Sequence, residues 1–153
     1  MNKTQFLSLA CLSLAGLALA GAVNAQTPDN CPTLAADSGL SWKQLDGPSF
    51  TFCKALRDSD GSEAFAVTIS EDSPFKPRRG DRAEQASIDG HDVYWYRSEV
   101  AAAPDALVRE TLLELEQDRV AHISLQAGSQ EQLADLLRQV GAIRFQEKRL
   151  SSN

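Results

Sequence analysis

Residues 123–145, ISLQAGSQEQLADLLRQVGAIRF, determine the fold class because they pass directly from a strand pattern to a helix pattern. Ser129, followed three residues later by Gln132, forms a capping box, which marks the start of a helix. Apolar side chains then follow helical spacing at Leu133, Leu136, Leu137 and Val140, and Gly141 is placed to end the helix. The apolar stripe of this helix must pack on a sheet. Beyond the helix, Ile143 and Phe145 predict a closing strand.

The segment before this helix, residues 101–127, fits two patterns. Helical spacing is met by Val108, Leu112 and Leu115, and strand alternation by Thr111, Leu113 and Leu115. We favour a hairpin with a strand at 109–116, a turn at 117–118 and a returning strand at 119–125. This register sets Glu116 opposite Arg119, an oppositely charged pair, and places His122 near Leu113.

Four further strands are predicted earlier in the chain. A turn in LDGPSF (45–50) precedes a strand at 50–56, and the Asp-Gly turn in RDSDGSE (57–63) leads into the strand EAFAVTIS (63–70). The stretches AEQASI (83–88) and HDVYWYR (91–97) flank Asp89-Gly90, the dipeptide most suited to a two-residue hairpin turn. Alternation then places Val93 and Trp95 on one face and Tyr94 and Tyr96 on the other.

These elements define the fold class as α+β, with an antiparallel sheet of hairpins covered by a C-terminal helix. We expect a single domain with one disulfide. The expected organisation is a signal peptide at 1–25, an N-terminal arm at 26–41, the α+β domain at 42–147 and a flexible tail at 148–153. The 153-residue chain without its leader suits one core better than two.

The first residues predict export. Lys3 precedes an apolar run from residue 6 to residue 20, and Val23-Asn24-Ala25 ends a stretch of small residues. This is the pattern of a secretory signal peptide cleaved after Ala25. The run is shorter than the roughly 20 residues of a transmembrane helix, so no membrane segment is expected after cleavage. The predicted location is periplasmic or secreted.

The cysteines predict a disulfide. Of the three, Cys11 lies in the leader, which leaves Cys31 and Cys53 as a pair in an oxidising compartment. Their spacing differs from the C-x-x-C motif of redox enzymes. The bond would tie the N-terminal arm to the first strand of the sheet.

Charge and motif content exclude several function classes. The chain has 15 basic and 21 acidic residues and a net charge of −6, which argues against general nucleic-acid binding. No G-x-S-x-G or H-E-x-x-H motif and no phosphate-binding glycine loop is present. We therefore expect no catalytic residues, no metal site and no cofactor. His91, beside a turn, and His122, on a strand, remain the histidines of an alternative enzyme hypothesis.

One loop departs from this acidic background. In SPFKPRRGDR (73–82), four basic residues crowd a proline-containing segment, and guanidinium groups bind carboxylates and phosphates with two parallel hydrogen bonds. Phe75 would add an apolar anchor. The candidate binding residues are Phe75, Lys76, Arg78, Arg79 and Arg82. The alternative is a solvated loop whose charges balance Glu71, Asp72, Asp81 and Glu84.

The order of hairpins followed by ISLQAGSQEQLADLLRQVGAIRF resembles the PsbP-like α/β/α sandwich family over about residues 40–147. The resemblance implies a non-catalytic accessory or binding domain. We therefore expect an exported envelope domain that binds an envelope protein or cell-envelope component, in one form an inhibitor or immunity-type protein. The alternative is a small periplasmic enzyme that uses a histidine and neighbouring carboxylates.

Overall fold

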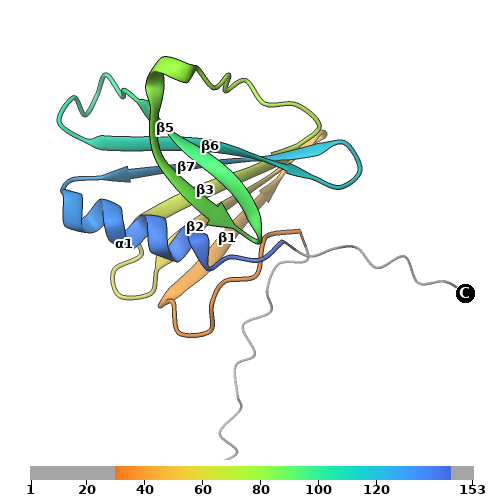
Figure 1. Ribbon diagram of the computed structural model, residues 1–153. Coiled ribbons are helices and arrows are strands. Elements are labelled where there is room, and N and C mark those ends of the chain that lie inside the picture. Colours follow the sequence, from red (N-terminus) through yellow and green to blue (C-terminus); the bar gives the residue numbers. More distant parts are fainter. Residues whose placement is uncertain (1–29, 146–153) are drawn as a thin grey trace, which may run out of the picture.

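The structure is a computed structural model that describes residues 30–145 (Figure 1). In this part of the chain, seven strands form one antiparallel sheet and a single α-helix follows the last strand. The elements are β1 (Leu40–Asp46), β2 (Phe50–Arg57), β3 (Glu63–Ser70), the 3-10 turn η1 (Arg79–Asp81), β4 (Arg82–Ile88), β5 (His91–Ser98), β6 (Leu107–Leu115), β7 (Arg119–Ala127) and α1 (Gln130–Gly141). The expected sheet with a C-terminal helix is thus confirmed, with sheet predominating.

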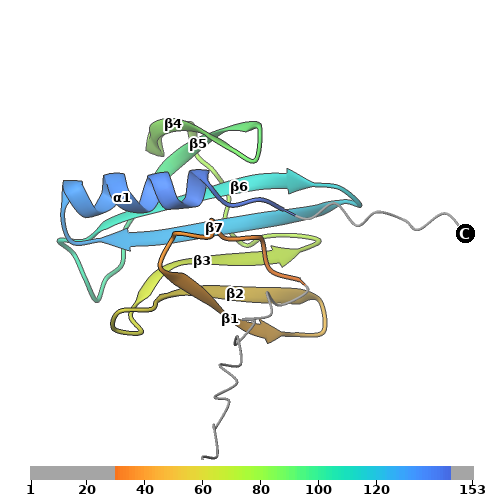
Figure 2. The same ribbon diagram turned by 90° about the horizontal axis from the view of Figure 1, so that it is seen from below.

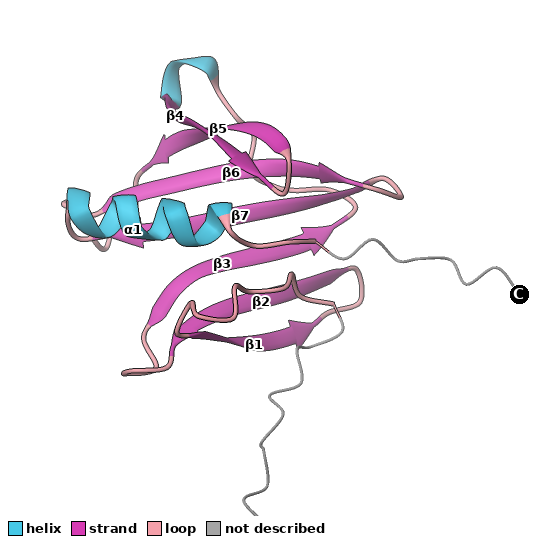
Figure 3. Ribbon diagram, turned by 60° about the horizontal axis from the view of Figure 1, so that its bottom comes forward, coloured by secondary structure: helices cyan, strands magenta, loops and turns pink. Residues whose placement is uncertain are grey.

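The sheet consists of two meanders joined at its centre. Its strand order is β1-β2-β3-β7-β6-β5-β4, so β3 pairs with β7. The connection from β3 to β4, residues 71–81, therefore crosses from the middle of the sheet to its far edge. Strands β1 and β4 form the two margins of the sheet (Figure 3).

Helix α1 covers one face of the sheet, which we call the inner face (Figure 2). Ser129 caps the helix by accepting a hydrogen bond from the backbone N–H of Gln132, as predicted. The Gln132 side chain returns to the N–H of Gly128 instead of that of Ser129. Because Leu133, Leu136 and Val140 share one side of the helix, all three are buried against the sheet.

Side chains from six strands, β2 to β7, fill the core beneath α1. Inner-face strand residues that are at most 1% exposed are Cys53, Ala55, Phe65, Val67, Ile88, Trp95, Thr111, Ala121, Ile123 and Ala127. Trp95 is 0% exposed, and Trp42 packs edge-on against Phe65 with ring centroids 5.6 Å apart. The predicted alternation of β5 holds, because Val93 and Trp95 are buried while Tyr94 faces the other side.

The hairpin turns confirm one prediction and correct another. Asp89 and Gly90 both have positive φ, +50° and +80°, as a type I′ turn requires. The predicted hairpin at 109–125 also forms, as β6 and β7. Its register is different, however: Leu115 pairs with Arg119, so Glu116 lies in the turn and does not face Arg119. Gln117 and Asp118 adopt positive φ in this longer turn. The same register sets His122 opposite Leu112 instead of near Leu113.

The segment before β1 is fixed against the inner face. Cys31 and Cys53 form the predicted disulfide, and the Trp42 indole N–H donates to the carbonyl of Pro32 at 2.6 Å. Thr33 exchanges two backbone hydrogen bonds with Arg144. Up to residue 145, where the described chain ends, this single bridge is all that forms after α1, so the predicted closing strand at Ile143 and Phe145 is wrong. Ile143 is nevertheless fully buried in the core.

Two expectations fall outside the described residues. The signal peptide at 1–25 and the tail at 148–153 both lie there. Between residues 30 and 145, no helix has the length and apolar character needed to cross a membrane.

Candidate interaction surface on the outer face of the sheet

The face opposite α1, the outer face, is defined by the strand registers. One row of outer-face side chains runs across five strands: Leu45, Phe52, Thr68, His122 and Leu112. The next row crosses all seven strands: Lys43, Lys54, Ala66, Ser124, Glu110, Tyr96 and Arg82. In contrast to the inner face, this surface has no helix over it within the described chain.

Phe75, from the β3–β4 connection, covers part of the outer face. Its ring stacks on His122 with centroids 5.1 Å apart and an interplanar angle of 7°, and it contacts Tyr96 edge-on at 5.9 Å. The backbone around it is held by Ser73, which is buried and accepts a hydrogen bond from the Phe75 N–H. The aromatic residue expected as an apolar anchor for a partner is therefore half-buried on the sheet of this protein.

Phe75→Ala is expected to lower the free energy of unfolding by about 1–2 kcal/mol, because two aromatic contacts are lost. Urea denaturation at pH 7 measures this change. Lys76→Ala is the matched control, since Lys76 forms only an exposed ion pair with Asp72 and its loss should cost less than about 0.5 kcal/mol. Equal effects of the two substitutions would show that Phe75 does not hold the connection to the sheet.

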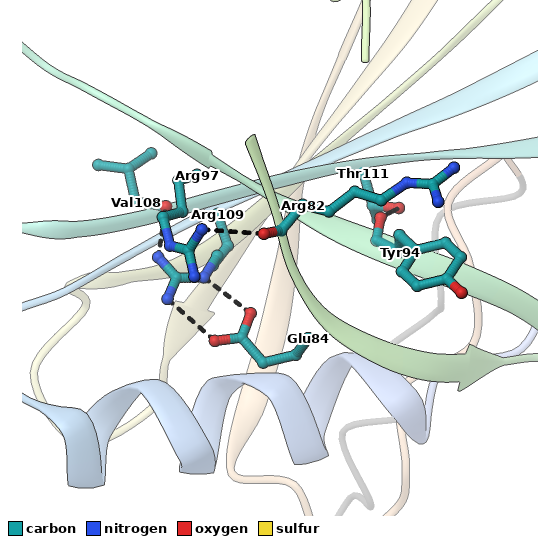
Figure 4. Close-up of polar contacts among 7 residues, drawn as sticks. All are labelled: Arg82, Glu84, Tyr94, Arg97, Val108, Arg109 and Thr111. Atoms are coloured by element: carbon teal, nitrogen blue, oxygen red, sulfur yellow. Dashed lines mark hydrogen bonds and ion pairs between the residues drawn. The ribbon is translucent and has the colours of Figure 1, made fainter. Parts of the chain in front are cut away.

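The four basic residues of SPFKPRRGDR (73–82) differ in their contacts. Lys76 Nζ lies 3.1 Å from a carboxylate oxygen of Asp72. The guanidinium of Arg82 lies over the Tyr94 ring, 4.3 Å from its centroid (Figure 4). Arg78 and Arg79 are exposed and form no ion pair within residues 30–145. They are the two basic residues of this loop left open to a partner.

A partly buried ion pair lies at the β4 edge, and it was not predicted from the sequence. Arg109 is 7% exposed and binds Glu84 through two hydrogen bonds, of 2.8 Å from Nε and 2.9 Å from Nη2 (Figure 4). Arg97 pairs directly with Arg109 in the register and donates to the carbonyl of Arg82. One carboxylate thus lies beside two guanidinium groups, and Glu84 does not balance the basic loop as expected.

The electrostatics of this pair follow from its geometry. The hydrogen bonds from Arg109 lower the pKa of Glu84 below its usual value of 4.5, against the opposing effect of partial burial. Glu84 therefore stays ionised to a lower pH than an unpaired glutamate. The arrangement fits a structural role, since its donors and acceptors are already matched.

His122 and Glu110 form the pair of outer-face side chains that most resembles a catalytic histidine with its carboxylate. Its Nε2 lies 3.0 Å from Glu110 Oε1, and the two side chains are 17% and 19% exposed. This contact with His122 is the main cause that lowers the pKa of Glu110, and burial opposes it. Phe75 stacks on the imidazole, however, so a substrate cannot approach that side of the ring without displacing it.

The other elements of an enzyme hypothesis lie apart from this pair. His91 is exposed beside the β4–β5 turn. A shallow pocket of about 290 Å³ beside α1 is lined by Arg57, Ser129, Glu131, Gln132, Asp135, Leu136 and Gln139, and it includes neither histidine. Within residues 30–145, no group of three metal-ligating side chains comes together.

Two exposed large apolar side chains of the outer face lie at the β1–β2 hairpin, and a third, Tyr94, lies apart from them on β5. Leu45 is 61% exposed and Phe50 is 38% exposed, and half-buried Phe52 pairs directly with Leu45. With Lys43 and Lys54, these residues make up what we call the β1–β2 patch. The hairpin holds Phe50 in place, because its ring lies against Gly47 in the space that a Cβ would occupy.

The two lysines of the β1–β2 patch are arranged unfavourably. Lys43 pairs directly with Lys54, and like charges opposite each other in a sheet are destabilising. Glu63 compensates only one of them, through an ion pair of 2.8 Å with Lys54. Among the described residues, Lys43 has no acidic partner. A local arrangement that opposes stability in this way is typical of functional surfaces.

The comparisons with known proteins add no family assignment. No family model matches the chain, and neither the curated proteins nor the solved structures give a significant match. The resemblance to the PsbP-like family therefore stays a prediction.

Proposed function

We propose that this protein is a non-catalytic binding domain of the bacterial cell envelope, which holds a partner protein on its β1–β2 patch. The observation that carries the proposal is the exposure of Leu45 and Phe50 in one hairpin, on a sheet face that no helix of the described chain covers. Small soluble domains rarely expose grouped apolar side chains, and such groups mark interaction sites. An aromatic and an aliphatic anchor beside lysines match the anatomy of protein interfaces.

Export of the protein is supported by the disulfide between Cys31 and Cys53. Such bonds persist in oxidising compartments, and the leader pattern at residues 1–25 leads there. A partner in the periplasm or outside the cell follows from that location. The specific form that we propose is an inhibitor or immunity-type protein bound to an envelope hydrolase.

Site-specific photocrosslinking in intact cells tests this function. Benzoylphenylalanine replaces Leu45 in one variant and Phe50 in another, and Ala134, exposed on α1, is the matched control position. We expect both patch positions to give an adduct of one defined mass and the control position to give none. Adducts at position 134 alone, or at no position, would contradict the proposal.

The basic loop is tested in the same assay. Arg78 and Arg79 are exposed and lie outside the β1–β2 patch, so they form a separate candidate contact. If they bind the partner, Arg78→Glu together with Arg79→Glu lowers the adduct yield at position 45. An unchanged yield eliminates the loop from the interface.

A small enzyme is the second candidate function, and the contact between His122 and Glu110 favours it. A histidine oriented by a carboxylate can act as a general base. We rank this function second because Phe75 covers the imidazole. A hydrolytic activity of the purified protein that is lost in His122→Ala and retained in His91→Ala would reverse this ranking.

A further inference from the structure

The two margins of the sheet differ in how open they are to another strand. Strand β4 is interrupted by a register shift between Arg82 and Gln85, and such bulges keep edges from pairing. Strand β1 pairs with β2 in a continuous register over all seven residues and contains no proline. Within the described residues, no strand pairs with the outer edge of β1. Its unpaired N–H and C=O groups form a regular edge for strand addition.

Lys43 lies at the centre of this edge strand. The outer-face side chains of β1 are Ser41, Lys43 and Leu45, and the last is the most exposed large apolar side chain of the described chain. A residue on an added strand directly opposite Lys43 would lie close to it on the side away from Lys54. An acidic side chain at that point would compensate the charge that the protein itself leaves uncompensated.

We propose that β1 accepts a strand from the partner protein, with an acidic residue opposite Lys43 and an apolar residue opposite Leu45. This inference rests on the proposed function and specifies its contact. Main-chain hydrogen bonds along β1 would supply affinity, and the two side-chain positions would supply selectivity. The resulting sheet would have eight strands, and the β1–β2 patch would lie beside the added strand.

A second copy of this chain does not meet these requirements. Two β1 strands that pair antiparallel about a twofold axis bring outer-face residues opposite outer-face residues. Because Ser41, Lys43 and Leu45 are the outer-face residues of β1, no register sets an acidic side chain opposite Lys43. The centred register sets Lys43 opposite its own copy, which is unfavourable.

Peptide binding followed by NMR tests the inference with a defined probe. The probe is a capped heptapeptide of alternating valine and threonine with glutamate at its centre, and the matched control has lysine at its centre. At low salt we expect the glutamate peptide to bind about five-fold more tightly than the lysine peptide. We also expect the amide signals of residues 40–46 to shift while those of β4 do not. Equal binding of the two peptides, or no shift in β1, would overturn the inference.

Lys43→Glu supplies the second test. The new carboxylate would lie opposite Lys54 as an oppositely charged pair, so the melting temperature is expected to rise by about 2 °C. The same variant should prefer the lysine peptide to the glutamate peptide. A stabilised variant that keeps the original preference would show that Lys43 does not select the partner strand.

The two experiments separate the inference from the proposed function. Crosslinks at positions 45 and 50 without peptide binding to β1 would retain the binding function and reject strand addition. Selective peptide binding without crosslinks in cells would establish a competent edge and reject the proposed function.

Discussion

Replacing Cys31 and Cys53 together by alanine is expected to lower the free energy of unfolding by about 3 kcal/mol. The disulfide closes a loop between residues 22 positions apart and so restricts the unfolded chain. Both cysteines are buried in the core, so the bond also holds the segment before β1 against the inner face. Urea denaturation of the two proteins under identical conditions measures the difference.

The reduced wild-type protein provides the control for this double substitution. Dithiothreitol should lower its free energy of unfolding by a similar amount and leave the double variant unchanged. A wild-type protein whose stability does not respond to reduction would contradict the disulfide contribution.

Replacing Glu84 by glutamine is expected to lower the free energy of unfolding by about 2 kcal/mol at pH 7. The substitution removes the carboxylate that binds Arg109 with two hydrogen bonds and leaves a buried guanidinium opposite Arg97. Replacing Glu84 and Arg109 together by leucine is the matched control. That pair of substitutions should cost less than Glu84→Gln, because no unpaired charge stays buried.

The same pair determines part of the pH dependence. Because the folded-state pKa of Glu84 lies below its usual 4.5, its contribution is fully present above that pH. It is lost as the pH falls through the folded-state pKa. Glu110 has a lowered pKa and contributes with the same sign. The wild-type protein should therefore lose stability in acid more steeply than Glu84→Gln, as denaturation at pH 7 and at successively lower pH values would show. Equal slopes would contradict the role of this ion pair.

Local patterns predicted most of the elements of the fold. The capping residue Ser129 and the apolar spacing after it mark α1, and Asp89-Gly90 marks the β4–β5 turn, because each signal lies within a few residues. The strand β1 was not predicted, because its alternation of apolar and polar residues is weak. Trp42 and Gln44 lie on the inner face, and Leu45 is the one strongly apolar residue on the outer face. The β6–β7 register differed by one residue, because the turn takes up Glu116.

The candidate surface could be predicted only in part. Phe75 and the basic loop stood out in the sequence, but their neighbours come from β5 and β7, which only the sheet topology brings near. The Glu84–Arg109 pair joins residues 25 positions apart across a strand order that alternation alone does not give. The β1–β2 patch depended on knowing which face of the sheet α1 covers. The sequence alone does not indicate which of the two faces the helix covers.

Crosslinking from position 45, compared with position 134 in the same cells, tests most directly whether the β1–β2 patch is the binding surface. We expect one adduct of defined mass from position 45 and none from position 134 on α1. An adduct from position 134 with none from position 45 would contradict it.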